Sequence, residues 1–132
     1  MLSEHEVKQY SPLSLAFLGD GVYSLLVRDM LLTRANMPIG KLHKESVSYV
    51  RASYQAKAVD LIYDILTDNE KDILRRGRNS HTVHVPKGSD REEYSKSTAL
   101  EALFGYLHLC GDKERICYLF DMIINNIEAE KE

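Results

Sequence analysis

The chain has 132 residues, of which 44% are hydrophobic, and this size and composition predict one domain, residues 1–132, with a single buried core. Its formal net charge of −3 excludes nucleic-acid binding by overall charge, so any such binding needs a local basic surface. The N-terminal residues do not form an export signal, and no apolar run approaches the roughly 20 residues that span a bilayer, so we expect no membrane association and a cytoplasmic location.

A first helix is predicted from Pro12 to about Leu32. The Ser11 hydroxyl can cap free backbone amides, and proline suits the first helical position because its missing N–H would have no partner there. Apolar side chains occupy almost every face of this segment. This pattern predicts a helix that other helices surround at the centre of the fold.

Apolar and small residues then recur at helical spacing from Ile39 to Leu66, which indicates one long helix or two in tandem. Thr67 and Glu70 have the spacing of a capping box, and they predict a short helix that ends near Arg76, with Gly77 as its left-handed cap. Residues 79–90, which include a proline and a glycine, read as a loop.

A second, nearly all-apolar helix is predicted from Arg91 to Cys110, followed by a stop at Gly111 and Asp112 and a last helix through Asn125. The two cysteines, Cys110 and Cys117, lie in these helical patterns without a partnering histidine pair. They are best interpreted as reduced thiols and not as a disulfide or a zinc site. No segment alternates at a period of two residues, so the predicted class is an all-α helical bundle.

Each of the two most apolar helices carries one carboxylate in its middle, Asp20 in the first and Glu101 in the second. An unpaired buried carboxylate is costly, and a divalent cation between the two acids would compensate for that cost. Oxygen ligands favour Mg²⁺ or Mn²⁺. Gly19, Gly21 and Gly105 would let helix backbones or a ligand approach closely. The alternative is that the acids pair with arginines and that the glycines serve packing alone.

The segment Leu15-Ala16-Phe17-Leu18-Gly19-Asp20-Gly21-Val22 resembles the signature helix of the ribonuclease III family. The segment Glu101-Ala102-Leu103-Phe104-Gly105-Tyr106-Leu107 is similar to the second motif of that family. Arg76-Gly77-Arg78-Asn79, the Pro86-Lys87 loop and Tyr94-Ser95-Lys96-Ser97-Thr98 resemble the bacterial branch called Mini-ribonuclease III, which lacks a separate double-stranded-RNA-binding domain. The resemblance covers about residues 8–126.

Two positions depart from the pattern of the full-length family. Ala16 stands four residues before Asp20, and Thr98 stands three residues before Glu101, where that pattern has acids. Helical spacing places each departure on the same face as the remaining acid, so both missing carboxylates would belong to one site, which therefore has fewer acidic ligands. The two missing acids put a second tightly held metal in doubt. The Mini-ribonuclease III branch shares this sparse arrangement, and Mg²⁺ readily keeps several waters, so a site with two carboxylates and water is chemically reasonable.

The resemblance implies a single ribonuclease III catalytic domain that hydrolyses double-stranded RNA with Asp20 and Glu101 as catalytic, metal-binding acids. It further implies Mg²⁺ as cofactor, with Mn²⁺ as a possible substitute, and products that carry a 5′-phosphate. A homodimer would place one site on each strand, with the first helix forming part of the interface. The branch also implies that the natural substrate is the precursor of large-subunit (23S) ribosomal RNA, with a ribosomal protein as a possible helper.

Basic residues gather between residues 75 and 91, where five of them stand against a single acid, Asp90. The candidate RNA-binding residues among them are Arg75, Arg76, Arg78 and Lys87. The resemblance places this segment near the substrate groove, although an arginine run is also typical of a solvated face. We expect solvated positions for the basic residues of the 39–66 segment, namely Lys41, Lys44 and Arg51.

Two other functions compete with this interpretation. One is a non-catalytic ribonuclease III-like scaffold that binds RNA in a ribonucleoprotein, but a scaffold has no need of Asp20 and Glu101. The other is an all-helical nucleotide pyrophosphatase, which needs a denser acidic cluster of the Glu-Glu-x-x-Glu kind. Here Lys96 follows Glu92-Glu93 at the position where that cluster requires an acid.

Overall fold

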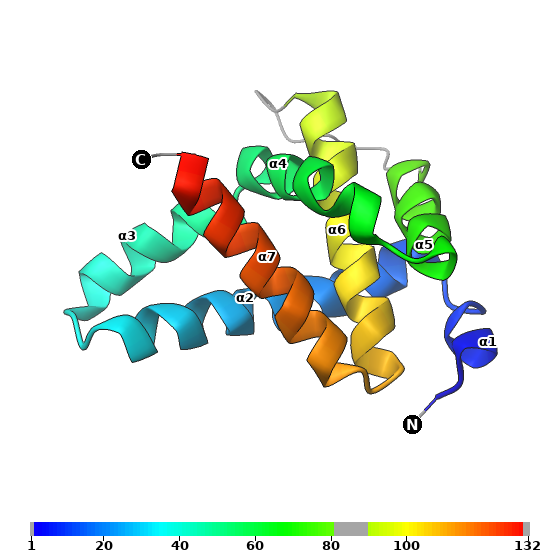
Figure 1. Ribbon diagram of the computed structural model, residues 1–132, viewed down its shortest axis with the longest axis horizontal. Coiled ribbons are helices and arrows are strands. Elements are labelled where there is room, and N and C mark those ends of the chain that lie inside the picture. Colours follow the sequence, from blue (N-terminus) through cyan, green and yellow to red (C-terminus); the bar gives the residue numbers. More distant parts are fainter. Residues whose placement is uncertain (1, 81–89, 131–132) are drawn as a thin grey trace.

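The computed structural model describes residues 2–80 and 90–130, and this part of the chain is helical without any β-strand (Figure 1). Its elements in chain order are α1 (Glu4–Val7), α2 (Pro12–Arg34), α3 (Ile39–Val50), α4 (Ala52–Ile62), the 3-10 turn η1 (Tyr63–Ile65), α5 (Asp68–Arg78), α6 (Arg91–Leu109) and α7 (Lys113–Glu130). The predicted all-α class is confirmed. None of the described helices is long and apolar enough to cross a membrane.

Local signals place several helix ends where the sequence predicts them. The Ser11 hydroxyl caps α2 by accepting a hydrogen bond from the backbone N–H three residues further on, and Pro12 occupies the first helical position. Thr67 and Glu70 form both hydrogen bonds of a capping box at the start of α5. Gly111 ends α6 with a φ of 75°, which is the left-handed conformation that favours glycine.

Other boundaries differ from the prediction. The 39–66 segment forms two helices in tandem, because the backbone becomes extended at Arg51. The last helix continues to Glu130, beyond the predicted end at Asn125. The prediction that Gly77 caps α5 is wrong, since α5 passes through Gly77 and packs there against α6. A Cβ on Gly77 would lie 2.9 Å from Cα of Ala99.

The centre of the fold is α6, with α2, α4, α5 and α7 packed around it (Figure 1). Its middle is buried almost without interruption, at Ser97, Thr98, Ala99, Leu100, Ala102, Leu103, Phe104, Gly105, Tyr106 and Leu107. The prediction that the first helix is the central one is therefore wrong. Helix α2 buries one side only, at Leu15, Ala16, Gly19, Tyr23, Val27 and Leu31, because no described element covers its opposite side.

Helices α2 and α6 cross with their backbones in contact at two glycines. A Cβ on Gly19 would lie 1.6 Å from the carbonyl oxygen of Glu101, and a Cβ on Gly105 would lie 2.0 Å from the carbonyl oxygen of Leu15. Any side chain at either position would force the helices apart. Gly21 does not share this role, because a Cβ there would have no neighbour within 4 Å. The close approach expected for Gly19 and Gly105 is thus confirmed, and that for Gly21 is not.

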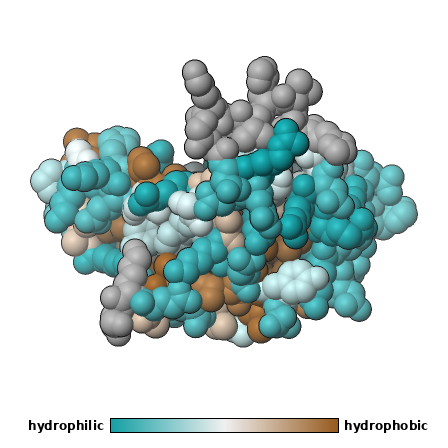
Figure 2. All heavy atoms as spheres, turned by 90° about the horizontal axis from the view of Figure 1, so that it is seen from above, coloured by the Kyte–Doolittle hydropathy of each residue, from teal (hydrophilic) through white to brown (hydrophobic). Residues whose placement is uncertain are grey.

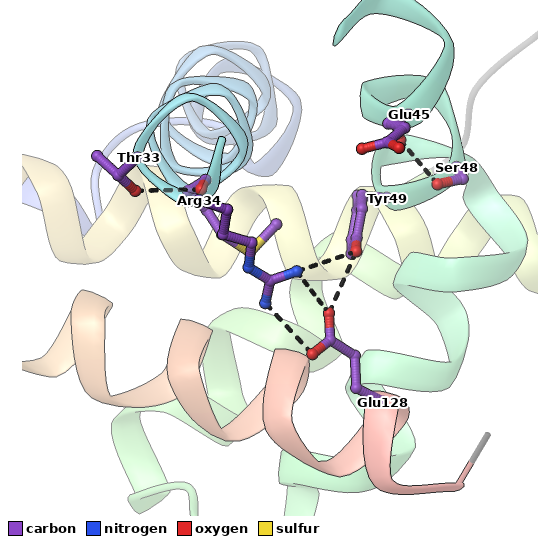
Figure 3. A network of polar contacts seen from close by, with 7 residues as sticks. Thr33, Arg34, Glu45, Ser48, Tyr49 and Glu128 are labelled. Carbon is purple, nitrogen blue, oxygen red and sulfur yellow. Dashed lines mark hydrogen bonds and ion pairs between the residues drawn. The ribbon is translucent and has the colours of Figure 1, made fainter. Parts of the chain in front are cut away.

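The second half of α2 and the whole of α3 extend from the bundle as an arm (Figure 1). No residue of α3 is fully buried. Arg34 at the end of α2 forms two hydrogen bonds of 2.9 and 3.2 Å to the carboxylate of Glu128 on α7, and Tyr49 of α3 donates a third of 3.2 Å (Figure 3). This cluster, Arg34–Tyr49–Glu128, ties the arm to the last helix.

Candidate active site

Asp20 of α2 and Glu101 of α6 meet beside the glycine crossing. The contact between Gly19 and the backbone of residue 101 brings the two acids together, although 80 residues of chain separate them. Burial, then a side-chain hydrogen bond with Asp20 and the charge of Asp20, together raise the pKa of Glu101 to about 8. The two carboxyl groups therefore lie next to one another, as the hypothesis of a shared metal site requires.

The two acids differ in their exposure. Glu101 is partly buried between helices, whereas Asp20 is exposed to solvent, at the edge of the packed side of α2. The expectation that both carboxylates occupy costly positions inside apolar helices is wrong for Asp20, because α2 is covered on one side only. An exposed acid next to a shielded one makes an open site that a solvent-borne cation and a large substrate can reach.

The donor chemistry of this pair fits a hard divalent cation. Two adjacent carboxylates supply oxygen ligands, and a cation would relieve the repulsion that raises the pKa of Glu101. Among residues 2–80 and 90–130, no group of three or more His, Cys, Asp or Glu side chains could hold a metal ion. Waters or substrate oxygens would have to complete the coordination, which is a common arrangement for Mg²⁺.

The two positions that depart from the full-length family pattern serve packing. Ala16 is buried against the core. Thr98 is also buried, and its hydroxyl donates a 3.1 Å hydrogen bond to the carbonyl of Tyr94 on its own helix. Ala16 has no side-chain oxygen, and neither position supplies the carboxylate that the full-length family pattern has there. The site is therefore sparse, as the sequence predicts.

The candidate RNA-binding arginines do not lie with the acids. Arg75 pairs with Asp72 at 2.6 Å, and Arg78 pairs with Glu92 at 3.2 Å. Both arginines line a cleft of about 870 Å³ between α4, α5 and the start of α6. Ala99 also lines this cleft, and it stands two residues from Glu101, so it points to the other side of α6. The surface around α4 and α5 is mainly hydrophilic (Figure 2).

Arg76 has a different environment from its neighbours. Its guanidinium donates hydrogen bonds of 3.3 and 3.5 Å to the backbone carbonyls of Lys8 and Tyr10, just before α2. Arg76 thus fastens the N-terminal segment to α5, which sequence spacing could not indicate. The fourth candidate, Lys87, lies outside the described residues.

The expectation of solvated positions for Lys41, Lys44 and Arg51 is confirmed, and these residues form a basic outer face on α3 and at its C-terminal cap. Lys41, Lys44 and Arg51 are all exposed, and within the described part of the chain none of them takes part in a salt bridge. Their spacing already places them on one side of a helix. The fold agrees with this, because α3 packs on α2 and α4 and leaves these three side chains exposed.

Comparisons with known proteins agree with this architecture. The ribonuclease III domain family matches residues 13–112. A protein of Thermoanaerobacter sp. (strain X514) named Mini-ribonuclease 3 is 45% identical over 128 residues, which are 97% of this chain and 90% of the relative. A Mini-ribonuclease 3 of Streptococcus pneumoniae is 36% identical and covers 94% of this chain and 98% of its own length. A crystal structure of a Fusobacterium nucleatum protein superposes with a TM-score of 0.82 at 32% identity, over 92% of this chain and 97% of that one.

The helical fold and the paired acids, together with these matches, define a ribonuclease of the class whose catalytic domain is built from helices alone. The chain belongs to the ribonuclease III family, in the branch whose members are named Mini-ribonuclease 3. It is accordingly an endoribonuclease, and double-stranded RNA is the substrate class of this family, whose members generally depend on divalent metals.

Proposed function

We propose that this chain is a magnesium-dependent endoribonuclease that cleaves double-stranded RNA, with Asp20 and Glu101 as its metal-binding catalytic acids and Mn²⁺ as a possible substitute. The observation that carries the proposal is the meeting of these two carboxyl groups, from helices far apart in sequence, at a backbone contact that only glycine permits.

The two acids have distinct tasks in this mechanism. When bound, Mg²⁺ would activate a water for attack on the phosphodiester and neutralise the charge that develops on the phosphate. Asp20, exposed to solvent, faces the incoming RNA, whereas Glu101, shielded between helices, keeps a defined position. Hydrolysis in this family leaves a 5′-phosphate and a 3′-hydroxyl.

The exposed side of α2 supports the proposal of a homodimer. Leu13, Phe17, Leu25 and Leu32 are 42, 86, 68 and 57% exposed and follow one another along this side. Apolar side chains exposed in such a row are typical of a protein interface. A second copy of the chain would cover them and place two sites along one duplex, so that each site cuts one strand.

Duplex RNA would be held by basic residues outside the acid pair. We retain Arg75, Arg76, Arg78 and Lys87 as candidate phosphate contacts. The side chains of Arg75 and Arg78 remain 64 and 52% exposed although each pairs with an acid, whereas the contacts of Arg76 favour a structural role. The basic face of α3, defined by Lys41, Lys44 and Arg51, is a second candidate, because contacts to phosphates position a duplex without reading its bases.

The natural substrate that we propose is the precursor of 23S ribosomal RNA, trimmed in the cytoplasm with a ribosomal protein as possible helper. This proposal follows from the branch of the family alone. Sequencing of RNA ends from cells with and without the protein tests it. Unchanged 23S ends in cells without the protein would contradict it.

The metal-site proposal is tested by Asp20→Asn and Glu101→Gln, which remove a charge while keeping side-chain volume. We expect each variant to lose cleavage of a short duplex in Mg²⁺, with helicity unchanged by circular dichroism. Thermal stability without metal should be unchanged or higher, since a repelling charge has gone. The matched control is Asp29→Asn, an exposed acid nine residues further along α2. Full cleavage by either site variant would contradict the assignment, as would equal loss in the control.

A further inference from the structure

Arg28 is a basic side chain within the apolar row on the exposed side of α2. It follows Leu25 by three residues and precedes Leu32 by four, so helical spacing places all three on one face. Arg28 is exposed, and among residues 2–80 and 90–130 it takes part in no salt bridge. A charge inside a covered apolar surface is costly unless the covering molecule supplies an opposite charge. A second copy that covers this row must therefore bring an acid to Arg28.

Asp20 is an acid at the edge of the same row. At about 100° per residue, Asp20 and Asp29 stand on opposite edges of the exposed side of α2, and both are exposed. Within the described part of the chain, neither of them takes part in a salt bridge. One side of α2 therefore carries apolar side chains, an unpaired arginine and unpaired acids, which are the elements of a self-complementary surface.

Two copies of α2 can pack on each other around a two-fold axis in two ways. An axis parallel to the helices would place Arg28 beside its own copy and the two Asp20 edges on opposite sides of the dimer. An axis perpendicular to the helices makes them antiparallel, so that Arg28 of one copy approaches the half of α2 that carries Asp20 of the other. This arrangement also leaves both Asp20 residues on one side of the dimer. Opposite charges then meet and both sites can face one duplex, which favours the antiparallel arrangement.

Burial of the whole row sets the approximate register of this pair. The row runs from Leu13 to Leu32, so its midpoint, and with it the two-fold axis, lies near residues 22 and 23. The partner's Arg28 then lies opposite Phe17, about three residues or about 4.5 Å along the helix axis from Asp20. Asp29 lies about 12 residues or about 18 Å away along the same axis. An arginine side chain spans the first distance and not the second, so the partner's Arg28 reaches the edge of Asp20.

We propose that Arg28 of the partner subunit completes the site of Asp20 and Glu101, where its guanidinium binds a phosphate of the RNA strand that is cut. This inference rests on the proposed metal site and the proposed homodimer. Without RNA the guanidinium pairs with Asp20, and with RNA it donates N–H groups to the phosphate beside the acids. Two carboxylates repel the phosphate backbone, and this guanidinium offsets part of that repulsion. Each site then needs both copies of the chain.

The test compares two mixed dimers, each isolated through a different tag on either copy. In the first, one copy carries Asp20→Asn and the other carries Arg28→Gln. In the second, one copy is wild type and the other carries both substitutions. The two dimers contain the same substitutions and differ only in how these are distributed, so each is the matched control of the other.

The first mixed dimer should retain one complete site, with Asp20 from one copy and Arg28 from the other. We expect it to nick one strand of a short duplex with about half of the wild-type kcat, because one of two sites is intact. The second mixed dimer has no complete site and should be no faster than the Arg28→Gln homodimer, whose kcat should fall about 10- to 100-fold. The Arg28→Gln homodimer should also bind the duplex about tenfold more weakly without Mg²⁺, where no cleavage occurs.

Equal kcat values of the two mixed dimers, or a faster second one, would overturn the proposal, since Arg28 would then not act across the interface. Wild-type cleavage by the Arg28→Gln homodimer would overturn it as well. If light scattering shows that Arg28→Gln no longer dimerises, Arg28→Lys replaces it in both mixed dimers with the same expected contrast, because lysine keeps the charge but not the planar fork. Failure of the proposed function is distinguishable: Asp20→Asn homodimers would then cleave like wild type. A wild-type protein that is monomeric at assay concentration would remove the homodimer and this inference together.

Discussion

Replacing Gly19 by alanine should separate the two helices that carry the acids. The new Cβ would lie 1.6 Å from the carbonyl oxygen of Glu101, whereas ordinary contact begins at 3.4 Å, so relief requires a shift of about 1.8 Å, the difference between the two. The backbone fixes the position of the Cβ, and the carbonyl that it meets is main chain, so neither group can rotate away. We expect a loss of about 3 kcal/mol in the free energy of unfolding, the upper end for overpacking, despite a helix-propensity gain of about 1 kcal/mol.

The same shift should damage catalysis in any protein that still folds. Asp20 follows Gly19 directly, so it moves away from Glu101 with the backbone. A misplacement of about 1 Å can cost about 100-fold in rate, and we expect at least that loss in kcat for Gly19→Ala. Urea unfolding followed by circular dichroism, together with duplex cleavage, measures both effects.

Gly21→Ala is the matched control, two residues further along the same helix. A Cβ there has no neighbour within 4 Å, so the variant should be as stable as wild type or about 1 kcal/mol more stable. Unfolding is compared over a range of protein concentrations, because dimerisation contributes to apparent stability. The reasoning would be refuted by a Gly19→Ala protein with wild-type stability and cleavage, or by equal damage in Gly21→Ala.

Three further predictions concern the rest of the molecule. Phe17→Ser, at the most exposed apolar side chain of α2, should convert the proposed dimer into a folded monomer, as measured by light scattering. Tyr118→Ser on α7 is the control and should remain dimeric. A dimeric Phe17→Ser protein would exclude this side of α2 as the interface. Glu70→Gln should cost about 3 kcal/mol at pH 7, because it breaks a buried ion pair with Arg115 of 2.8 Å. Burial by itself would raise the pKa of Glu70, but the hydrogen bonds from Arg115 and Thr67 outweigh burial and hold this pKa below 4.5. The stabilisation by the ion pair is therefore present above pH 4.5, and it disappears as the pH falls through the pKa of Glu70 in the folded protein. Urea unfolding at pH 7 and pH 3 should therefore show a difference between wild type and Glu70→Gln that shrinks in acid, and a constant difference would contradict the assignment. Arg78→Ala should reduce the slope of log affinity for duplex RNA against log salt concentration by about one unit. Arg76→Ala should mainly lower stability, because Arg76 contacts backbone carbonyls. An unchanged slope in Arg78→Ala would mean that Arg78 is solvated and does not contact RNA.

Features that depend on neighbours in sequence were predictable. The start of α2 at Ser11 and Pro12, the capping box of α5 and the stop at Gly111 all follow from hydrogen bonds and backbone preferences within a few residues. The candidate acids were also predictable, because a lone carboxylate in an apolar helix stands out in the pattern and because the surrounding motifs resemble a known family.

Features that depend on the packing of distant segments were not. The apolar pattern of α2 gives no sign of which side α6 covers, so neither the exposure of Asp20 nor the central place of α6 could be read from it. Arg76 belongs to an arginine run in sequence, yet it contacts backbone carbonyls that lie more than 60 residues earlier. Tyr23 looks like one more core residue in the sequence, yet among the described residues its buried hydroxyl has no hydrogen-bond partner. Sequence alone determined which residues are candidates for the chemistry and where several helices begin, because these signals are local. Only the tertiary structure decided which groups meet, because side-chain environment is set by helices that cross far apart along the chain.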